Sequence, residues 1–307
     1  MRFTVDYPIG SAGFAPAFLE PTTVTRFAGA VEEAGVDAIA FTEHPAPSKK
    51  WLDHGGHESF DPLTALAFCA ATTTRLRLMT YLLVLPYRNP LLAAKQIATV
   101  DVLSGGRTII GVGAGYLRSE FSALGVEFEE RNDLFDEGLE VLRGLWATDE
   151  FSFAGRSFKA LGQVSRPEPT QKPYPPVWVG GNSRKARERV VTYGQGWAPI
   201  IVDEATSKTT RTAPIDSVES LGEAIGDLRR MLEEAGRDPG DIDVQVQWSP
   251  ASSVDDDPAA TLGRIERLAA VGVTWLCLNP PGDDVERCID LLTAYAQDVI
   301  VPAHGVS

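Results

Sequence analysis

The chain contains few of the side chains that build disulfide frameworks or metal sites. Of its 307 residues, three are cysteine and four are histidine. The cysteines lie in or beside apolar stretches and show no Cys-x-x-Cys spacing. We therefore expect them to be small buried hydrophobic residues in a reduced compartment. They are Cys69, Cys277 and Cys288.

Positive charge is also in short supply. Lysine and arginine together number 28 against 42 aspartate and glutamate, which gives a formal net charge of −14. Nucleic acids and anionic membranes are bound by basic protein surfaces, so neither is expected as the main partner. One phosphate held locally by backbone amides is compatible with this balance.

Long apolar runs are absent as well. No stretch approaches 18 consecutive apolar residues, and the segment from Met1 to Asp6 lacks the apolar region of a signal peptide. Hydrophobic residues nevertheless make up 44% of the chain, enough for a large core. We expect a cytoplasmic globular protein.

Three familiar catalytic patterns are missing too. The first expected strand carries no His-x-His pair, which a metal-dependent barrel hydrolase would need for its metal. No expected strand contains a lysine that could form a Schiff base, and no Gly-x-Ser-x-Gly motif occurs. The chemistry is therefore expected to come from a cofactor, without a metal.

What the sequence does contain is a regular alternation of two patterns. Short β-branched or apolar runs are separated by stretches with helical periodicity. Eight strands that alternate with helices predict an α/β fold, a (β/α)8 TIM barrel in a single domain over residues 1–307. An open doubly wound sheet is the alternative. The eight runs are Phe3–Tyr7, Ala38–Phe41, Leu76–Leu85, Thr108–Gly113, Val177–Val179, Trp197–Ile200, Ile242–Trp248 and Trp275–Leu278.

Two stretches interrupt this alternation. Ala147–Pro176 contains three phenylalanines and five prolines and predicts a hairpin and an irregular loop inserted before the fifth strand. Val202–Pro214 is polar and rich in threonine and predicts a loop. Both are candidate lids, because loops build the active site of a barrel, and a solvated insertion is the alternative for each.

A histidine follows the second expected strand, in the segment Phe41-Thr42-Glu43-His44-Pro45. The functional face of a barrel lies at the C-terminal ends of its strands, so His44 would bring a group that titrates near neutral pH into the mouth. It is a candidate proton donor or hydrogen-bond partner of a cofactor ring. The alternative is an ordinary loop histidine.

The fifth strand ends in a pattern that is typical of anion binding. Gly180 and Gly181 let a ligand approach the backbone, Asn182 and Ser183 lead into a helix, and Arg184 begins its basic first turn. Basic residues oppose the usual preference of a first turn, which a bound phosphate would explain. A tight turn before a solvated basic helix is the alternative.

The fourth strand ends in alternating glycines. Gly111, Gly113 and Gly115 remove side chains where a flat ligand could lie, with Ala114 between them and Tyr116 available to stack on a ring. As a nucleotide-binding motif this pattern is weak. Close packing inside the barrel is the alternative.

A further segment, Asp53–Glu58, contains ligand types that suit zinc. Its Gly-Gly pair makes it a poor preorganised metal site, so we interpret it as a loop.

Four stretches of the chain resemble the luciferase-like monooxygenase superfamily, and most of all its branch that depends on the deazaflavin coenzyme F420. The similarity runs over essentially the whole chain, and residues 76–116 are its most specific part. It implies a (β/α)8 barrel that binds the ring of coenzyme F420, or of FMN, at its mouth. The four stretches are Phe41–His44, Leu83–Pro90, Asp101–Arg107 and Val177–Gly181.

The resemblance also implies roles for particular residues. A non-prolyl cis peptide bond that backs the cofactor ring would fall around Tyr81, Leu82 and Leu83. The family's phosphate-binding turn matches Gly180–Ser183, and its histidine near the ring matches His44.

One departure from the family is informative. Sugar-phosphate dehydrogenases of this branch carry a proton-donating glutamate just after the glycines of the fourth strand. The matching residues here are Gly113, Ala114 and Gly115. We therefore expect a different organic substrate.

Four functions follow from these observations. The first is F420-dependent hydride transfer to or from a small organic substrate, with His44 moving the proton. The second is an FMN-dependent monooxygenase that uses reduced flavin and O2. A non-redox barrel enzyme for a phosphorylated metabolite and a non-catalytic cofactor carrier come from other classes. The resemblance further implies a homodimer.

Overall fold

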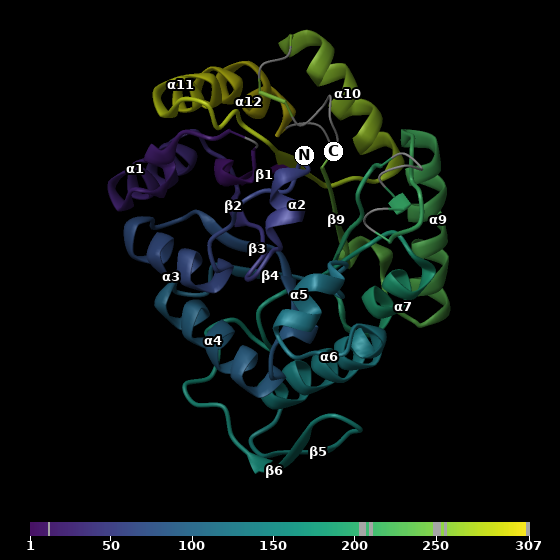
Figure 1. Ribbon diagram of the computed structural model, residues 1–307. Helices are drawn as coiled ribbons and strands as arrows, with labels where there is room; N and C mark the ends of the chain where they lie inside the picture. The colour runs from purple at the N-terminus through teal and green to yellow at the C-terminus, as the bar shows by residue number, and fades with distance from the viewer. Residues whose placement is uncertain (12, 203–206, 209–210, 248–252, 255–256, 305–307) are drawn as a thin grey trace.

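In a computed structural model, eight parallel strands close into a barrel ringed by helices (Figure 1). The structure describes residues 1–11, 13–202, 207–208, 211–247, 253–254 and 257–304. The strands follow the order β1-β10-β9-β8-β7-β4-β3-β2 around the barrel. The predicted (β/α)8 TIM barrel is therefore confirmed, and the open sheet is excluded because β1 pairs with both β2 and β10.

The barrel strands lie close to where the apolar runs predicted them. The expected bounds of β2, β4 and β10 agree to the residue, and Trp248, at the end of one expected strand, lies outside the described residues. The strands are β1 (Arg2–Asp6), β2 (Ala38–Phe41), β3 (Arg77–Val84), β4 (Thr108–Gly113), β7 (Val177–Gly180), β8 (Gly196–Ala198), β9 (Asp243–Val246) and β10 (Trp275–Leu278).

The helices begin with strong local signals. Asp61, Asn89, Ser183, Asp257 and Asp284 each accept a hydrogen bond from a backbone N–H of the first turn. The main helices are α1 (Pro21–Glu33), α2 (Lys49–Asp53), α3 (Pro62–Thr72), α4 (Pro90–Leu103), α5 (Arg118–Ala123), α6 (Arg131–Ala147), α7 (Arg184–Tyr193), α9 (Val218–Glu234), α10 (Pro258–Val271), α11 (Val285–Tyr295) and α12 (Val301–Ala303).

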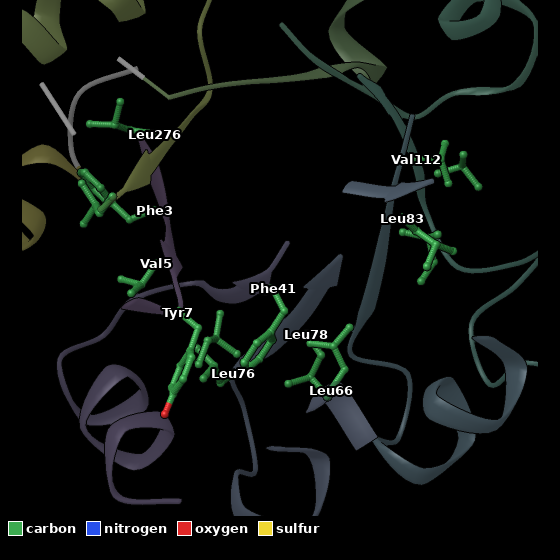
Figure 2. Packing of buried hydrophobic residues seen from close by; sticks show 14 of the residues in the cluster. Phe3, Val5, Tyr7, Phe41, Leu66, Leu76, Leu78, Leu83, Val112 and Leu276 are labelled. Carbon is green, nitrogen blue, oxygen red and sulfur yellow. The ribbon is translucent and has the colours of Figure 1, made fainter. Parts of the chain in front are cut away.

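Alternate side chains of each strand enter two different cores. Phe3, Val5 and Tyr7 belong to the large outer core between the barrel and its helices, where the Tyr7 and Phe41 rings stack at 5.0 Å (Figure 2). The inner core fills the barrel, with Trp178 and Trp275 edge to face at 5.2 Å. Because this core closes the barrel, a ligand can be bound only at one of its ends.

The insertion before β7 contains the predicted hairpin. Strands β5 (Phe151–Ala154) and β6 (Lys159–Gln163) pair antiparallel and lie outside the helical ring, at the lower edge of Figure 1. The insertion leaves the end of α6 at the N-terminal end of the barrel, and the hairpin runs back along the outside of that helix. Arg156, in its turn, pairs with Glu130 and Asp133 near the start of α6. The role of a lid stays a prediction for this insertion.

The stretch Asp101–Arg107, which carries part of the family resemblance, is structural. It joins α4 to β4 at that same N-terminal end. The Arg107 guanidinium donates to Ser104 O, Ala70 O and Leu76 O, and to the carbonyl and hydroxyl oxygens of Thr73, over 2.7–3.1 Å. This arginine therefore fastens α3, β3 and the loop before β4 to one another.

All three cysteines are buried, as expected. No helix within the described ranges has the length and apolar character needed to cross a membrane.

Candidate active site at the barrel mouth

His44 lies just beyond β2, at the C-terminal end of the barrel, as predicted. Its Nδ1 is 3.1 Å from Oε2 of Glu120, and the side chain is only 9% exposed. Its backbone N–H donates to the hydroxyl of Ser59 at 2.8 Å. Position and contacts hold the imidazole in one orientation at the mouth.

Glu120, on α5, is the residue that orients this histidine. Its carboxylate is fully buried and faces three groups: His44 Nδ1, the N–H of Ala46 at 3.1 Å, and the hydroxyl of Tyr87, also at 3.1 Å. A carboxylate held by two donors acts as an acceptor, so it assigns a hydrogen to Nδ1. Nε2 is then the ring nitrogen left for a substrate.

Aromatic rings enclose the imidazole. The centroid of the His44 ring lies 4.4 Å from Trp51, 4.8 Å from His57 and 5.9 Å from Tyr116. Gly56 permits this arrangement, because a Cβ at that position would lie 2.3 Å from the Trp51 ring. The rings displace water and lower the local dielectric constant, which strengthens the interaction between His44 and Glu120.

The segment Asp53–Glu58 therefore has a place in the site, although not as a metal site. Among the described residues, no group of three or more histidine, cysteine, aspartate or glutamate side chains could hold a metal ion. Burial lowers the pKa of His57, and the neighbouring His44 lowers it further, so a neutral imidazole is favoured. The loop interpretation is confirmed, and the loop brings His57 to His44.

Asp6, the last residue of β1, is a second proton-binding group near the mouth. Its Oδ1 is buried without a hydrogen-bond partner, and burial raises the pKa of the carboxyl to about 7. Asp6 raises the pKa values of the Tyr81 hydroxyl and the Cys277 thiol, after the larger effect of their own burial. Gly10 separates Asp6 from His57, since a Cβ there would lie 3.8 Å from Asp6 Oδ2 and 3.9 Å from His57 Nδ1.

Strand β3 carries a cis peptide bond between Tyr81 and Leu82, which confirms its predicted location. The register of β3 against β4 shifts between Thr80 and Leu83. Tyr81 and Leu82 both pack against the inner core, whereas Leu83 belongs to the outer core. The part that these residues play in holding a cofactor ring stays a prediction.

The glycines at the mouth serve packing inside the barrel. A Cβ at Gly111, Gly113 or Gly180 would meet the Leu82 side chain at 2.9, 3.3 and 2.1 Å, respectively. Gly115 has φ 77°, and a Cβ there would lie 2.6 Å from Val84. These glycines therefore make room for Leu82 and, at Gly115, for Val84. The part that Gly113, Ala114, Gly115 and Tyr116 play in binding a cofactor stays a prediction.

The turn between β7 and α7 lies at the mouth, but most of its polar groups are already paired. The N–H of Gly181 donates to Ala198 O at 3.2 Å, and that of Asn182 donates to the Thr212 hydroxyl at 2.9 Å. The side-chain amide of Asn182 donates to Ile200 O and Ala213 O, both at 2.8 Å. A phosphate that accepted a hydrogen bond from the backbone N–H of Asn182 would have to displace the Thr212 hydroxyl.

The two residues that follow this turn have local partners as well. Ser183 caps α7 by accepting the N–H of Ala186, and the largely exposed Arg184 pairs with Glu188 at 3.3 Å. Gly181 has φ 103°, so a side chain introduced there would test backbone strain together with phosphate binding. The binding roles of Gly180–Arg184 stay predictions.

Residues 1–272 match the model of the luciferase-like monooxygenases. The chain belongs to this family. Among its relatives, an F420-dependent glucose-6-phosphate dehydrogenase of Amycolatopsis mediterranei (strain U-32) is 27% identical, and the match covers 91% of this chain and 94% of that protein.

A second relative uses a different cofactor. An FMNH(2)-dependent dimethylsulfone monooxygenase of Pseudomonas putida is 35% identical over 138 residues, which make up 44% of this chain and 38% of that protein. Monooxygenase RslO1 from Streptomyces bottropensis has the same fold, with a TM-score of 0.79, 21% identity, and coverage of 99% of this chain and 100% of that one. The luciferase-like protein is an oxidoreductase, as expected, and its relatives use either F420 or FMN.

The mouth of this luciferase-like barrel suits a flat ring with polar edges. Leu82 supplies an apolar surface, and the orphaned Oδ1 of Asp6 and the Nε2 edge of His44 supply polar atoms. A flavin or deazaflavin ring has such a face and such edges, so these residues fit either group.

Sequence reasoning missed several residues of the site. Asp6 could have been found, because it is the charged residue at the end of the first expected strand. Glu120 gave no such signal, since it lies within a short helix 76 residues beyond His44. His57 lies in the segment Asp53–Glu58, which was interpreted only as a loop or a metal site, and Trp51 lies just before that segment, on α2.

Proposed function

We propose that this protein transfers a hydride between coenzyme F420 and a small organic substrate. The observation that carries the proposal is the buried pair of His44 and Glu120 at the barrel mouth. Support for F420 comes from the dehydrogenase relative, whose match covers 91% of this chain, whereas the match to the FMN-dependent relative covers 44%.

The residues of the site handle the proton that accompanies the hydride. When bound, the deazaflavin supplies or accepts the hydride at a substrate carbon. His44 gives a proton from Nε2 to the substrate atom that gains negative charge, or removes one in the reverse direction. Glu120 stabilises the imidazolium and keeps Nδ1 protonated, and the surrounding aromatic rings exclude water.

A second candidate is a monooxygenase that uses reduced FMN and O2. It is favoured by the 35% identity to the dimethylsulfone monooxygenase over 138 residues. The same His44 would then serve as the proton donor at the mouth. A cytoplasmic location and a homodimeric state are further expectations, and light scattering on the purified protein measures the second.

The decisive test is cofactor binding followed by turnover. Purified protein is titrated with F420 and with FMN while its intrinsic fluorescence is recorded, and the cofactor that binds is then used with a panel of carbonyl, alkene and alcohol substrates. We expect binding of F420 and hydride transfer without consumption of O2. Tight binding of FMN, none of F420 and O2-dependent turnover would establish the second candidate instead.

Replacing His44 by Ala is expected to reduce kcat by about 10²–10⁴-fold while the Kd of the cofactor changes little, because a general acid acts in the chemical step. Steady-state rates and fluorescence titrations measure the two effects separately. Unchanged turnover would return His44 to the role of a structural loop residue.

A further inference from the structure

Three arginines from separate parts of the chain surround one phenylalanine ring. The guanidinium carbons of Arg131, Arg118 and Arg211 lie 3.9, 4.1 and 5.3 Å from the centroid of the Phe128 ring. Arg118 begins α5, Arg131 begins α6, and Arg211 lies in the connection between β8 and α9. We call these three residues the arginine cluster.

Within the described part of the chain, one carboxylate forms an ion pair with an arginine of the cluster. Glu129 pairs with Arg118 at 2.7 Å, while Arg131 donates to a carbonyl oxygen, that of Phe128, at 3.0 Å. The nearby carboxylates of Glu130 and Asp133 pair with another arginine, Arg156.

The crowding of positive charge also affects Arg131, the arginine nearest to the Phe128 ring. Burial lowers the pKa of Arg131, and the charges of Arg211, Arg118 and Arg189 lower it further, whereas Glu129 opposes them. In a chain with a net charge of −14, like charges are thus held together at a cost that a bound anion would remove.

The cluster adjoins the turn between β7 and α7. Arg211 precedes Thr212, whose hydroxyl accepts the Asn182 N–H, and Ala213, whose carbonyl accepts from the Asn182 side chain. Arg118 and Arg211 follow β4 and β8, so they lie on the side of the mouth. Arg211 has φ 54°, an uncommon conformation for a residue other than glycine.

We propose that the arginine cluster binds the side chain of the cofactor through at least two negatively charged groups. This inference rests on the proposed function and deepens it. The side chain of coenzyme F420 has this chemistry, because a phosphodiester is followed by several carboxylates. Guanidinium groups bind both anions through paired hydrogen bonds, and a ligand with a single phosphate would use less of the cluster.

The test compares two ligands that share one ring. Intact F420 and the same deazaflavin with its ribityl chain but without phosphate or carboxylates are titrated against the full-length protein, and Kd is obtained from fluorescence. For the wild type, we expect at least tenfold tighter binding of F420. We also expect F420 affinity, and not that of the truncated ligand, to fall as salt is raised.

Variants then assign the effect to the cluster. Arg211→Gln and Arg118→Gln are each expected to weaken F420 binding about tenfold and to leave the truncated ligand unaffected. Arg156→Gln is the matched control, an exposed arginine that pairs with Glu130 and Asp133 beside the same helix start. This variant should change neither the Kd of F420 nor that of the truncated ligand.

The outcomes separate this proposal from the proposed function. Equal Kd values for the two deazaflavins, or equal losses for both ligands in the Arg211 and Arg118 variants, would overturn the role of the cluster and leave F420-dependent hydride transfer standing. Binding of FMN alone would overturn both. Melting temperatures of the variants identify any loss that comes from unfolding, and the test avoids the more buried Arg131.

Discussion

Asp6 and His44 both lie near the mouth, but their surroundings favour different protonated forms. Asp6 has a buried oxygen without a partner, which favours the neutral carboxylic acid. His44 faces the fully buried carboxylate of Glu120, which favours an imidazole that keeps the hydrogen on Nδ1. The site therefore contains two chemically different proton-binding groups, a carboxyl and an imidazole.

Replacing Asp6 by Asn is expected to change how stability depends on pH. The folded protein keeps the carboxyl proton up to a pKa of about 7, against an ordinary value of 3.8. Between these values the folded state binds more protons than the unfolded state, so the wild type loses stability as pH rises and levels off above pH 7.

Since Asn does not titrate, the Asp6→Asn variant should gain on the order of a few kcal/mol relative to the wild type between pH 4 and pH 8. Urea unfolding at both pH values measures the difference. Parallel pH dependence in the two proteins would show that Asp6 is ionised in the folded state.

Replacing Glu120 by Gln is expected to lower kcat at least tenfold with little change in KM, because the amide cannot stabilise a charged His44 ring. Glu120→Asp should restore part of the rate. Glu188→Gln, which removes an exposed partner of Arg184, is the control. A fall in melting temperature without this split between kcat and KM would mean that Glu120 only supports the fold.

At the scale of elements, Arg107 shows how the N-terminal end of the barrel is held. Its planar guanidinium reaches α3, the start of β3 and the loop before β4. Arg107→Lys should therefore cost about 2–3 kcal/mol of folding free energy, because an ammonium group cannot reproduce this fork of donors. Thermal unfolding measures the loss, and an unchanged cofactor Kd is expected because the mouth is at the opposite end.

The elements themselves could be predicted because the signal for each is local. The apolar runs gave eight strands, and Ser183 gave the start of α7. The side chain that a glycine makes room for cannot be predicted in this local way. Gly113 and Gly180 lie 67 positions apart in the chain, yet both accommodate Leu82, a residue of a third strand. The sequence therefore suggested open space where the folded barrel has a side chain.

At the scale of the whole molecule, the two ends of the barrel have different tasks. Arg107 lies at the N-terminal end, whereas His44, Glu120 and the arginine cluster lie at the mouth or beside it. Contacts at the mouth join residues far apart in the chain, so closure of the barrel is what assembles the site. A pattern read along one segment could not show this assembly.

The position of Trp51 has a practical consequence. Its indole lies 4.4 Å from the imidazole of His44, whereas Trp178 and Trp275 are sealed inside the barrel. Indole emission responds to a charge or a flat ring placed beside it, so Trp51 is a built-in optical reporter of His44. A Trp51→Phe variant would identify its share of the signal and let events at the mouth be followed in real time without an added dye.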